Sequence, residues 1–333
     1  MGWQLGIWGF LYVCCEQIEI NSNFALLRWF AMNGLDRYRG SLLGLACGDA
    51  IGTTVEFSSR ATFSFLTDMV GGGPFHLQPG EWTDDTSMAL CLATSLVEAK
   101  GFDARDQMDR YLDWFKNGYL SSNGSCFDIG NTTRAALRSY TETGDPFSGS
   151  GDPDLAGNGS LMRLAPVVLF FYPKRDLILH FCSESSRTTH AASECLDACC
   201  LFGDMLFRTL AGADKQDILL GSNPALVKSD TLKSIARGAY FKKTGSSVHG
   251  TGYVVESLEA ALWSFWTSDS FEQAILTAAN LGDDADTTAA ICGQIAGAYY
   301  GESGFPDRWL ERLVMKEEIG LLAEQLHKAS SST

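Results

Sequence analysis

The feature that most constrains the fold is a series of apolar runs at helical spacing, which begins near Leu35 and continues towards the C-terminus. Within each run, apolar residues recur every three or four positions, and this places them on one face of a helix. The clearest runs are residues 41–47, 86–99, 191–210, 257–266, 271–279 and 287–299. Strand-like alternation is scarce, and the eight prolines fall mostly between the runs. We therefore predict an all-α fold, with one compact multi-helix domain over residues 34–333.

Residues 1–33 form a separate N-terminal aromatic extension in this interpretation. They hold two clusters of aromatic and aliphatic residues, and Met32 just before the helical region is an alternative start. The apolar stretch at residues 3–15 lacks a basic leader and a small-residue cleavage site, so it does not resemble a secretory signal. No run reaches the roughly 18 apolar residues that a membrane span needs. We expect a cytoplasmic protein that makes no membrane contact.

The composition limits the partners of the chain. Its 333 residues are 45% hydrophobic and 20% charged, which is enough apolar material for a large core. The net charge of −15 argues against a nucleic-acid partner bound through its phosphates. A ligand that carries phosphate remains compatible with this charge if bound cations invert the local field. The ten cysteines form no CxxC pair, and we expect buried free thiols.

Two acidic clusters carry the strongest chemical signal. The sequence WTDDT at residues 82–86 opens one predicted helix, and DDADTT at residues 283–288 opens another. Either cluster alone could be a helix N-cap, because Thr and Asp favour that position. Packed together, the two clusters would repel unless a cation lay between them. Oxygen ligands without Cys or His favour Mg²⁺ or Mn²⁺, and the donors are numerous enough for two ions about 3.5–4 Å apart.

Five motifs in a fixed order connect these clusters to other parts of the chain. They are RGSLLGLACGDAIG at residues 39–52 followed by Glu56, PGEWTDDT at 79–86, CFDIGNTT at 126–133, GNGSLMR at 157–163 and LGDDADT at 281–287. In this order they resemble the ADP-ribosylglycohydrolase family, and particularly its dinitrogenase reductase-activating glycohydrolase branch. The resemblance covers about residues 35–301. The chain departs from it at Asp283, where the family usually has Gly.

The resemblance implies a binuclear metal site. In the family, two Mg²⁺ or Mn²⁺ ions bind the cis-diol of the distal ribose and lower the pKa of the attacking water. Loss of the leaving group gives an oxocarbenium-like centre. The residues that align with the ligands are Thr83, Asp84, Asp85, Asp284, Asp286 and Thr287.

The resemblance also suggests catalytic carboxylates. Glu56 and Asp128 are the two candidates for the acid or base, one at the metal end and one on a loop over the ribose. Asp85 is expected to be essential as well. Glu56 could instead be a solvated charge at a helix end.

The substrate-binding residues follow from the two glycine-containing motifs. The loop Gly157, Asn158, Gly159 and Ser160 precedes a predicted helix, whose free N–H groups could bind a pyrophosphate. Asn131, Asp128, Arg163 and His190 align with positions that bind the ligand in the family. The loop could also be an ordinary Asn-Gly turn, Arg163 could form a structural ion pair, and His190 could be a core residue.

The chain is therefore expected to be a metal-dependent hydrolase that removes ADP-ribose from a modified protein. The resemblance of Asp128 and Asn131 to the dinitrogenase reductase-activating branch implies the N-glycosidic bond to arginine, while a serine linkage stays open. The alternative is an immunity-type antitoxin whose residues 1–33 block a cognate ADP-ribosyltransferase, because exposed aromatic segments serve as interface anchors. An inactive family member is the third interpretation, although all the expected ligands are present.

Overall fold

The computed structural model describes residues 34–331, and within them it is built from helices without a named strand. The predicted all-α class is thereby confirmed. The N-terminal extension at residues 1–33, with the partner-binding role suggested for it, lies outside the described residues. The α-helices are α2 (Gly34–Gly52), α3 (Asp84–Ala99), α4 (Ala104–Asn117), α5 (Asn131–Thr143), α6 (Ala165–Phe171), α7 (Arg175–Arg187), α8 (Ser193–Leu210), α9 (Lys215–Leu220), α10 (Asp230–Ala236), α11 (Val254–Trp266), α12 (Phe271–Ala279), α13 (Ala285–Tyr300), α14 (Asp307–Arg312) and α15 (Lys316–Ser330). The 3-10 helices are η1 (Thr53–Val55), η2 (Pro153–Leu155), η3 (Pro224–Leu226), η4 (Ala239–Lys242), η5 (Gly245–Ser247) and η6 (Glu302–Gly304).

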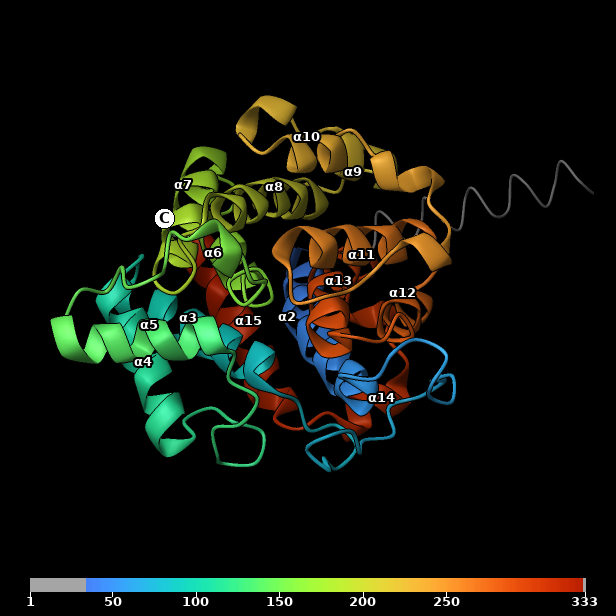
Figure 1. The fold of residues 1–333 in the computed structure, drawn as a ribbon, viewed down its shortest axis with the longest axis horizontal. Helices are drawn as coiled ribbons and strands as arrows, with labels where there is room; N and C mark the ends of the chain where they lie inside the picture. Colours follow the sequence, from blue (N-terminus) through green and yellow to red (C-terminus); the bar gives the residue numbers. More distant parts are fainter. Residues whose placement is uncertain (1–33, 332–333) are drawn as a thin grey trace, which may run out of the picture. The chain divides into compact units, whose positions relative to one another are not determined.

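Helices α2 and α13 form a closely packed antiparallel pair in the middle of the bundle (Figure 1). Nearly all their residues are buried, so both lack the polar face of a surface helix. Glycines recur every fourth residue along the contact face of α2 and meet the backbone of α13 directly. The opposed pairs are Gly40 with Gly297, Gly44 with Gly293, Gly48 with Ala289, and Gly52 with Ala285. This register sets the end of α2 beside the start of α13, where the second acidic cluster lies.

A buried carboxylate joins the first acidic cluster to the same region. Asp49 of α2 is 0% exposed and accepts hydrogen bonds from the backbone N–H and hydroxyl groups of Thr83 and Thr86. These two residues flank the start of α3, so Asp49 satisfies N–H groups that a helix leaves without an internal partner. Trp82, fully buried, donates its indole N–H to the carbonyl of Val314 and anchors the chain just before the helix. The starts of α3 and α13 are thus held at the same end of α2.

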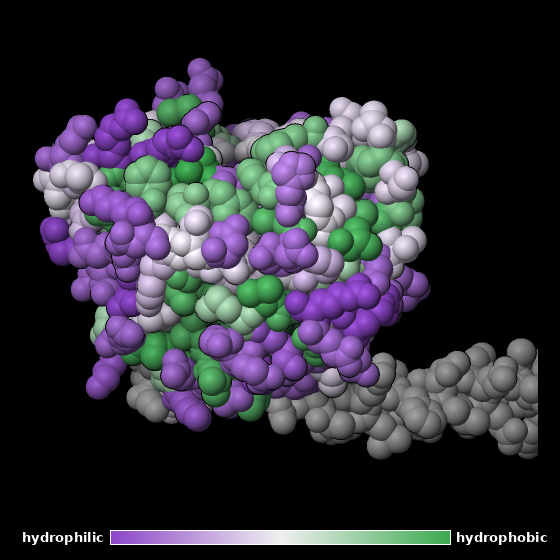
Figure 2. All heavy atoms as spheres, turned by 90° about the horizontal axis from the view of Figure 1, so that it is seen from below, coloured by the Kyte–Doolittle hydropathy of each residue, from purple (hydrophilic) through white to green (hydrophobic). Residues whose placement is uncertain are grey.

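The remaining helices surround this central pair and share one large hydrophobic core. Helix α13 also packs against α8, α11 and α12, while α3 packs against α4, α6 and α15. The surface seen in Figure 2 mixes hydrophilic and hydrophobic residues. Among the described cysteines, six of eight are buried and all are free, as the sequence predicted. None of the helices over residues 34–331 combines the length and the apolarity that crossing a membrane requires.

Substituting Gly44 with alanine should strongly destabilise the fold. A Cβ atom there would overlap the backbone carbonyl of Gly293, and backbone cannot rotate away as a side chain can. We expect the free energy of unfolding to fall by about 1–3 kcal/mol or more, despite the better helix propensity of alanine. Gly101→Ala is the control, because no atom lies within 4 Å of the added Cβ. Equal denaturant midpoints for the two variants would contradict the close α2–α13 packing.

Candidate active site

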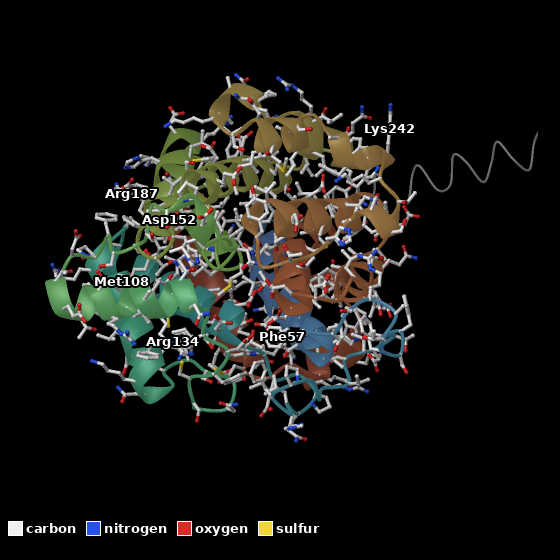
Figure 3. The ribbon with its side chains drawn as sticks, viewed as in Figure 1. Phe57, Met108, Arg134, Asp152, Arg187 and Lys242 are labelled. Atoms are coloured by element: carbon white, nitrogen blue, oxygen red, sulfur yellow. The ribbon has the colours of Figure 1, made fainter. Side chains whose placement is uncertain are left out.

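A cavity of about 800 Å³ opens where the end of α2 meets the starts of α3 and α13. Its volume is in the usual range of small-molecule sites. Phe57, labelled in Figure 3, lines the cavity and is 68% exposed. The residues that line it are Glu56, Phe57, Asp84, Asp128, Ile129, Gly130, Asn131, Thr132, Thr133, Gly157, Asn158, Gly159, Met162, His190, Thr251, Gly252, Asp283, Asp284 and Thr287. Four of the five sequence motifs contribute residues to the lining. The first motif is represented by Glu56 and Phe57, which follow it in the chain.

The two acidic clusters lie together at one end of this cavity. Carboxylate oxygens of Glu56, Asp284 and Asp286 all lie within 4.8 Å of one another. The hydroxyl of Thr83 is 3.3 Å from Asp286 Oδ2 and 3.4 Å from Asp85 Oδ2. These distances bring residues from α3 and α13, far apart in the sequence, within one hydrogen-bonding network. Thr287 completes it, with its hydroxyl 3.4 Å from Asp85 Oδ2.

The carboxylates in this network have strongly perturbed pKa values. Burial, with the charges of Asp128 and Asp284, raises the pKa of Glu56 to about 9. Burial, with the nearby Asp284, also raises the pKa of Asp128 to about 7. Asp85 and Asp286 have pKa values well above the ordinary range, again first because of burial. Buried like charges without a cationic partner produce such shifts, which are common at functional sites.

Two buried oxygen atoms indicate what the network lacks. Oδ1 of Asp85 and Oδ1 of Asp286 are inaccessible, and no hydrogen-bond partner for either occurs among the described residues. An unpaired buried acceptor is costly, and bound cations would give such oxygens partners. The surrounding donors are carboxylate and hydroxyl oxygens without His or Cys, which suits a hard divalent ion. The residues present therefore fit a site for a hard divalent cation.

Asp49 belongs to this region and was missed by the sequence analysis. It lies within the first motif but was not assigned a role there. Burial raises its pKa to about 6, although hydrogen bonds from Thr86 and Thr83 act in the opposite direction. The available signal was an acid inside an otherwise apolar helix, because a buried acid needs partners.

The predicted substrate residues form the rest of the wall around the acidic network. Asp128, with φ of 58°, and Asn131, the first residue of α5, both line the cavity. Gly157, Asn158 and Gly159 line it as well, and the amide of Asn158 donates to Asp284 Oδ2 over 2.6 Å. This bond ties the glycine loop to the acidic network.

The local structure after the glycine loop differs from the prediction. The sequence placed residues 157–160 directly before a helix, but residues 158–163 form turns and α6 begins only at Ala165. Pro166 in the first turn suits a helix start, and the Ala165 N–H donates to Gln294 Oε1 over 2.8 Å. No helix N-terminus is therefore formed by the glycine loop itself.

The other three predicted substrate residues are Ser160, Arg163 and His190, and only His190 lines the cavity. Ser160 is buried, and its hydroxyl lies 2.8 Å from that of Ser186. Arg163 is 0% exposed, does not line the cavity and, among the described residues, forms no salt bridge. It lies over the Tyr111 ring at 4.6 Å instead. His190 lines the cavity beside the glycine loop.

Without divalent metal, the protein should lose stability as the pH rises. The pKa values of Asp49, Asp128 and Glu56, about 6, 7 and 9, all lie above those of exposed carboxylates. The folded state therefore retains protons that the unfolded state releases, and the resulting stability is lost between about pH 4 and 9. Asp68, whose pKa is lowered to about 2, acts only below this window.

Thermal unfolding in EDTA from pH 5 to 8.5 measures this effect. A pKa that is higher by one in the folded protein than in the unfolded chain corresponds to about 1.4 kcal/mol of free energy. We expect the midpoint to fall by several degrees, and saturating Mg²⁺ to remove most of the loss. A metal-free midpoint that rises with pH would contradict a buried acidic cluster.

The comparison with known families decides the classification. The family model described as ADP-ribosylglycohydrolase matches residues 31–333. The chain belongs to the ADP-ribosylglycohydrolase family. The family assignment made from the five motifs is confirmed.

Individual relatives agree with this assignment. An "ADP-ribosylarginine hydrolase Tri1" of Serratia proteamaculans (strain 568) is 46% identical over 292 residues, which cover 88% of this chain and 79% of the relative. An "ADP-ribosyl-[dinitrogen reductase] glycohydrolase" of Rhodospirillum rubrum is 32% identical over 288 residues, which cover 85% of this chain and 92% of the relative. A solved structure titled "ADP-ribosylglycohydrolase-related protein complex" matches with a TM-score of 0.80 and 43% sequence identity. The match covers 89% of this chain and 99% of the chain in that structure. The names of the two relatives describe hydrolases and give no support to the antitoxin alternative.

Proposed function

We propose that this protein is a metal-dependent hydrolase that removes ADP-ribose from modified arginine side chains of a protein. The observation that carries the proposal is the acidic network of Glu56, Asp284 and Asp286 at one end of a cavity large enough for a nucleotide sugar. The arginine linkage is supported by relatives at 46% identity that are named ADP-ribosylarginine hydrolases. The substrate partner is therefore an ADP-ribosylated protein.

The cofactor in this proposal is a pair of Mg²⁺ or Mn²⁺ ions. Their support is the oxygen-only donor set and the two buried oxygens without a partner, on Asp85 and Asp286. When bound, the cations would polarise the ribose hydroxyls and the attacking water. The proposed ligands are Thr83, Asp84, Asp85, Asp284, Asp286 and Thr287.

Asp128 and Glu56, which are outside the ligand set, act on the leaving group and on the attacking water in this proposal. The C1''–N bond breaks, and its electron pair moves to the guanidine nitrogen, which leaves most easily while the group is protonated. Asp128 lines the cavity, and in this proposal its carboxylate holds that guanidinium by charge-assisted hydrogen bonds. Water then adds to C1'' and gives its proton to a carboxylate, for which Glu56 is available at the acidic end. The proton finally returns to the leaving guanidine, so the products are arginine and ADP-ribose.

The remaining predicted residues bind the nucleotide part in this proposal. Asn131, Gly157, Asn158, Gly159 and His190 line the cavity and contact the ligand directly. Ser160 and Arg163 support this wall from behind, because both are buried and neither lines the cavity.

Steady-state kinetics on matched substrates tests the linkage. The same peptide is prepared with ADP-ribose on arginine or on serine, and release of ADP-ribose is followed with saturating Mg²⁺. We expect kcat/KM to be at least about tenfold higher for arginine, a difference of about 1.4 kcal/mol in transition-state binding. Release from serine but not from arginine would show the assignment to be wrong.

A further inference from the structure

A buried chain of hydrogen bonds runs from Arg163 to the imidazole of His190. Nη2 of Arg163 donates to the hydroxyl of Thr189 over 2.6 Å, and that hydroxyl lies 2.8 Å from Nδ1 of His190. Arg163 and Thr189 are 0% exposed and His190 is 3% exposed. Each of these groups therefore has to find its partners inside the protein.

The direction of the chain fixes the tautomer of His190. A guanidinium can only donate, so Thr189 Oγ1 accepts the bond from Arg163. The Thr189 hydroxyl still has one proton, and among the described residues the acceptor within its reach is Nδ1 of His190. Nδ1 is then unprotonated, so the ring proton of a neutral imidazole resides on Nε2. Burial, together with the charge of Arg163, lowers the pKa of His190 to about 3, which agrees with a neutral ring.

The other ring nitrogen faces the glycine loop at the cavity. His190 lines the cavity, and a Cβ atom added to Gly159 would lie 2.8 Å from its Cε1 and 3.1 Å from its Nε2. A Cβ atom on Gly157 would lie 3.5 Å from Nε2. No hydrogen bond joins Nε2 to any described residue, so this N–H is left for a ligand.

The backbone of His190 is held as firmly as its ring. Its N–H donates to the Ser186 carbonyl over 2.7 Å, and its carbonyl accepts from the Ser186 hydroxyl over 2.7 Å. The backbone is thus fixed just after α7, while the glycine loop and the hydrogen bond at Nδ1 position the ring.

We propose that Thr189 and Arg163 are positioning residues that hold His190 as the Nε2–H tautomer, so that it donates a hydrogen bond to an oxygen of the bound ADP-ribose. The identity of the ligand rests on the proposed function, whereas the tautomer does not. Arg163 acts through Thr189 and touches no ligand. The proposal explains why a guanidinium without an ion-pair partner in the described residues is buried behind this wall.

The tautomer can be measured directly in the free protein. The chain has five histidines, so ¹⁵N labelling of histidine gives a simple long-range ¹H–¹⁵N spectrum, and His190 is assigned by its loss in His190→Gln. We expect Nδ1 in the unprotonated range and Nε2 in the protonated range, with no titration from pH 5 to 8. A His190 ring protonated at Nδ1 would overturn the proposal. This readout does not depend on activity.

Variants of Thr189 test the consequence for binding. Thr189→Val removes the hydroxyl at nearly constant shape, so the tautomer preference should weaken and the Kd of ADP-ribose, measured by calorimetry with Mg²⁺, should rise about five- to tenfold. Thr189→Ser restores the hydroxyl and should bring both readouts back to within about twofold of the natural protein. Thr209→Val is the matched control, because it removes a buried hydroxyl that bonds only to a helix carbonyl.

The outcomes separate this proposal from the proposed function. Thr189→Val also deprives Arg163 of an acceptor, so its thermal midpoint is compared with that of Thr189→Ser, and the tautomer of the natural protein is measured in any case. Unchanged tautomer and affinity in a folded Thr189→Val would overturn the relay even if arginine-linked ADP-ribose is hydrolysed. The Nε2–H tautomer in a protein that does not bind ADP-ribose would support the relay and contradict the proposed function.

Discussion

Replacing Asp284 with alanine should reduce ADP-ribose release by at least about 100-fold, the loss typical of damaged metal sites. Asp284 is half-buried among the acids at the start of α13, and one of its oxygens lies within 4.8 Å of those of Glu56 and Asp286. The helical fold should be kept, because removing one carboxylate from a crowded acidic cluster relieves repulsion. The metal-free variant should therefore unfold at an equal or higher temperature than the natural protein.

Three measurements on the same preparation separate the possible causes. Calorimetric titration with Mn²⁺ should show weaker binding, circular dichroism should show an unchanged helix content, and the release assay should show the loss. Asp85→Ala should behave in the same way. Asp152→Ala is the control, since this exposed residue caps η2 outside the cavity lining (Figure 3). Full activity of Asp284→Ala in saturating Mg²⁺ would show that the acidic network is not a metal centre.

Asp128→Asn should lower kcat on arginine-linked substrate by about 10- to 100-fold, the loss expected when charge-assisted hydrogen bonds to the leaving guanidinium are removed. Asparagine keeps the size of the side chain but loses the charge that holds a guanidinium. The affinity for the product ADP-ribose should change far less, because this ligand has no guanidinium.

The contrast between kcat and product affinity gives this test its specificity. A merely structural role for Asp128 would weaken ADP-ribose binding and turnover together. Asp145→Asn serves as the matched control, because Asp145 is an exposed aspartate on the loop that follows α5. If Asp128→Asn hydrolysed the arginine linkage at the natural rate, Asp128 would not be the group that holds the leaving guanidinium.

The helical architecture was predictable because it follows from local spacing. Apolar periodicity indicated the helices at residues 41–47, 86–99, 191–210, 257–266, 271–279 and 287–299 independently of one another. The antiparallel register of Gly44 against Gly293 was not predictable, because it depends on which backbones touch across a long stretch of chain.

The acidic network was predictable only in part, from the local sequence of its two clusters. Two Asp-Thr clusters at helix starts suggested a shared cation, and the structure places Asp85 and Thr287 within one hydrogen-bonding network. Asp49 and the relay through Thr189 were not found, because their partners come from separate segments that only the fold brings together. The position of Arg163 also depended on the fold, since sequence spacing cannot distinguish a side chain in the cavity wall from one behind it.

The most direct test of the central claim is to identify the products formed from one defined substrate. A peptide with ADP-ribose on a single arginine is incubated with the protein, and the anomeric C1'' proton is followed by ¹H NMR with Mg²⁺ and with EDTA. With Mg²⁺, the signal of the N-glycosidic linkage should disappear while unmodified arginine and intact ADP-ribose appear in equal amounts, and with EDTA the substrate should persist. Equal turnover in EDTA, or cleavage at the pyrophosphate that leaves ribose on the arginine, would contradict a metal-dependent N-glycosyl hydrolase.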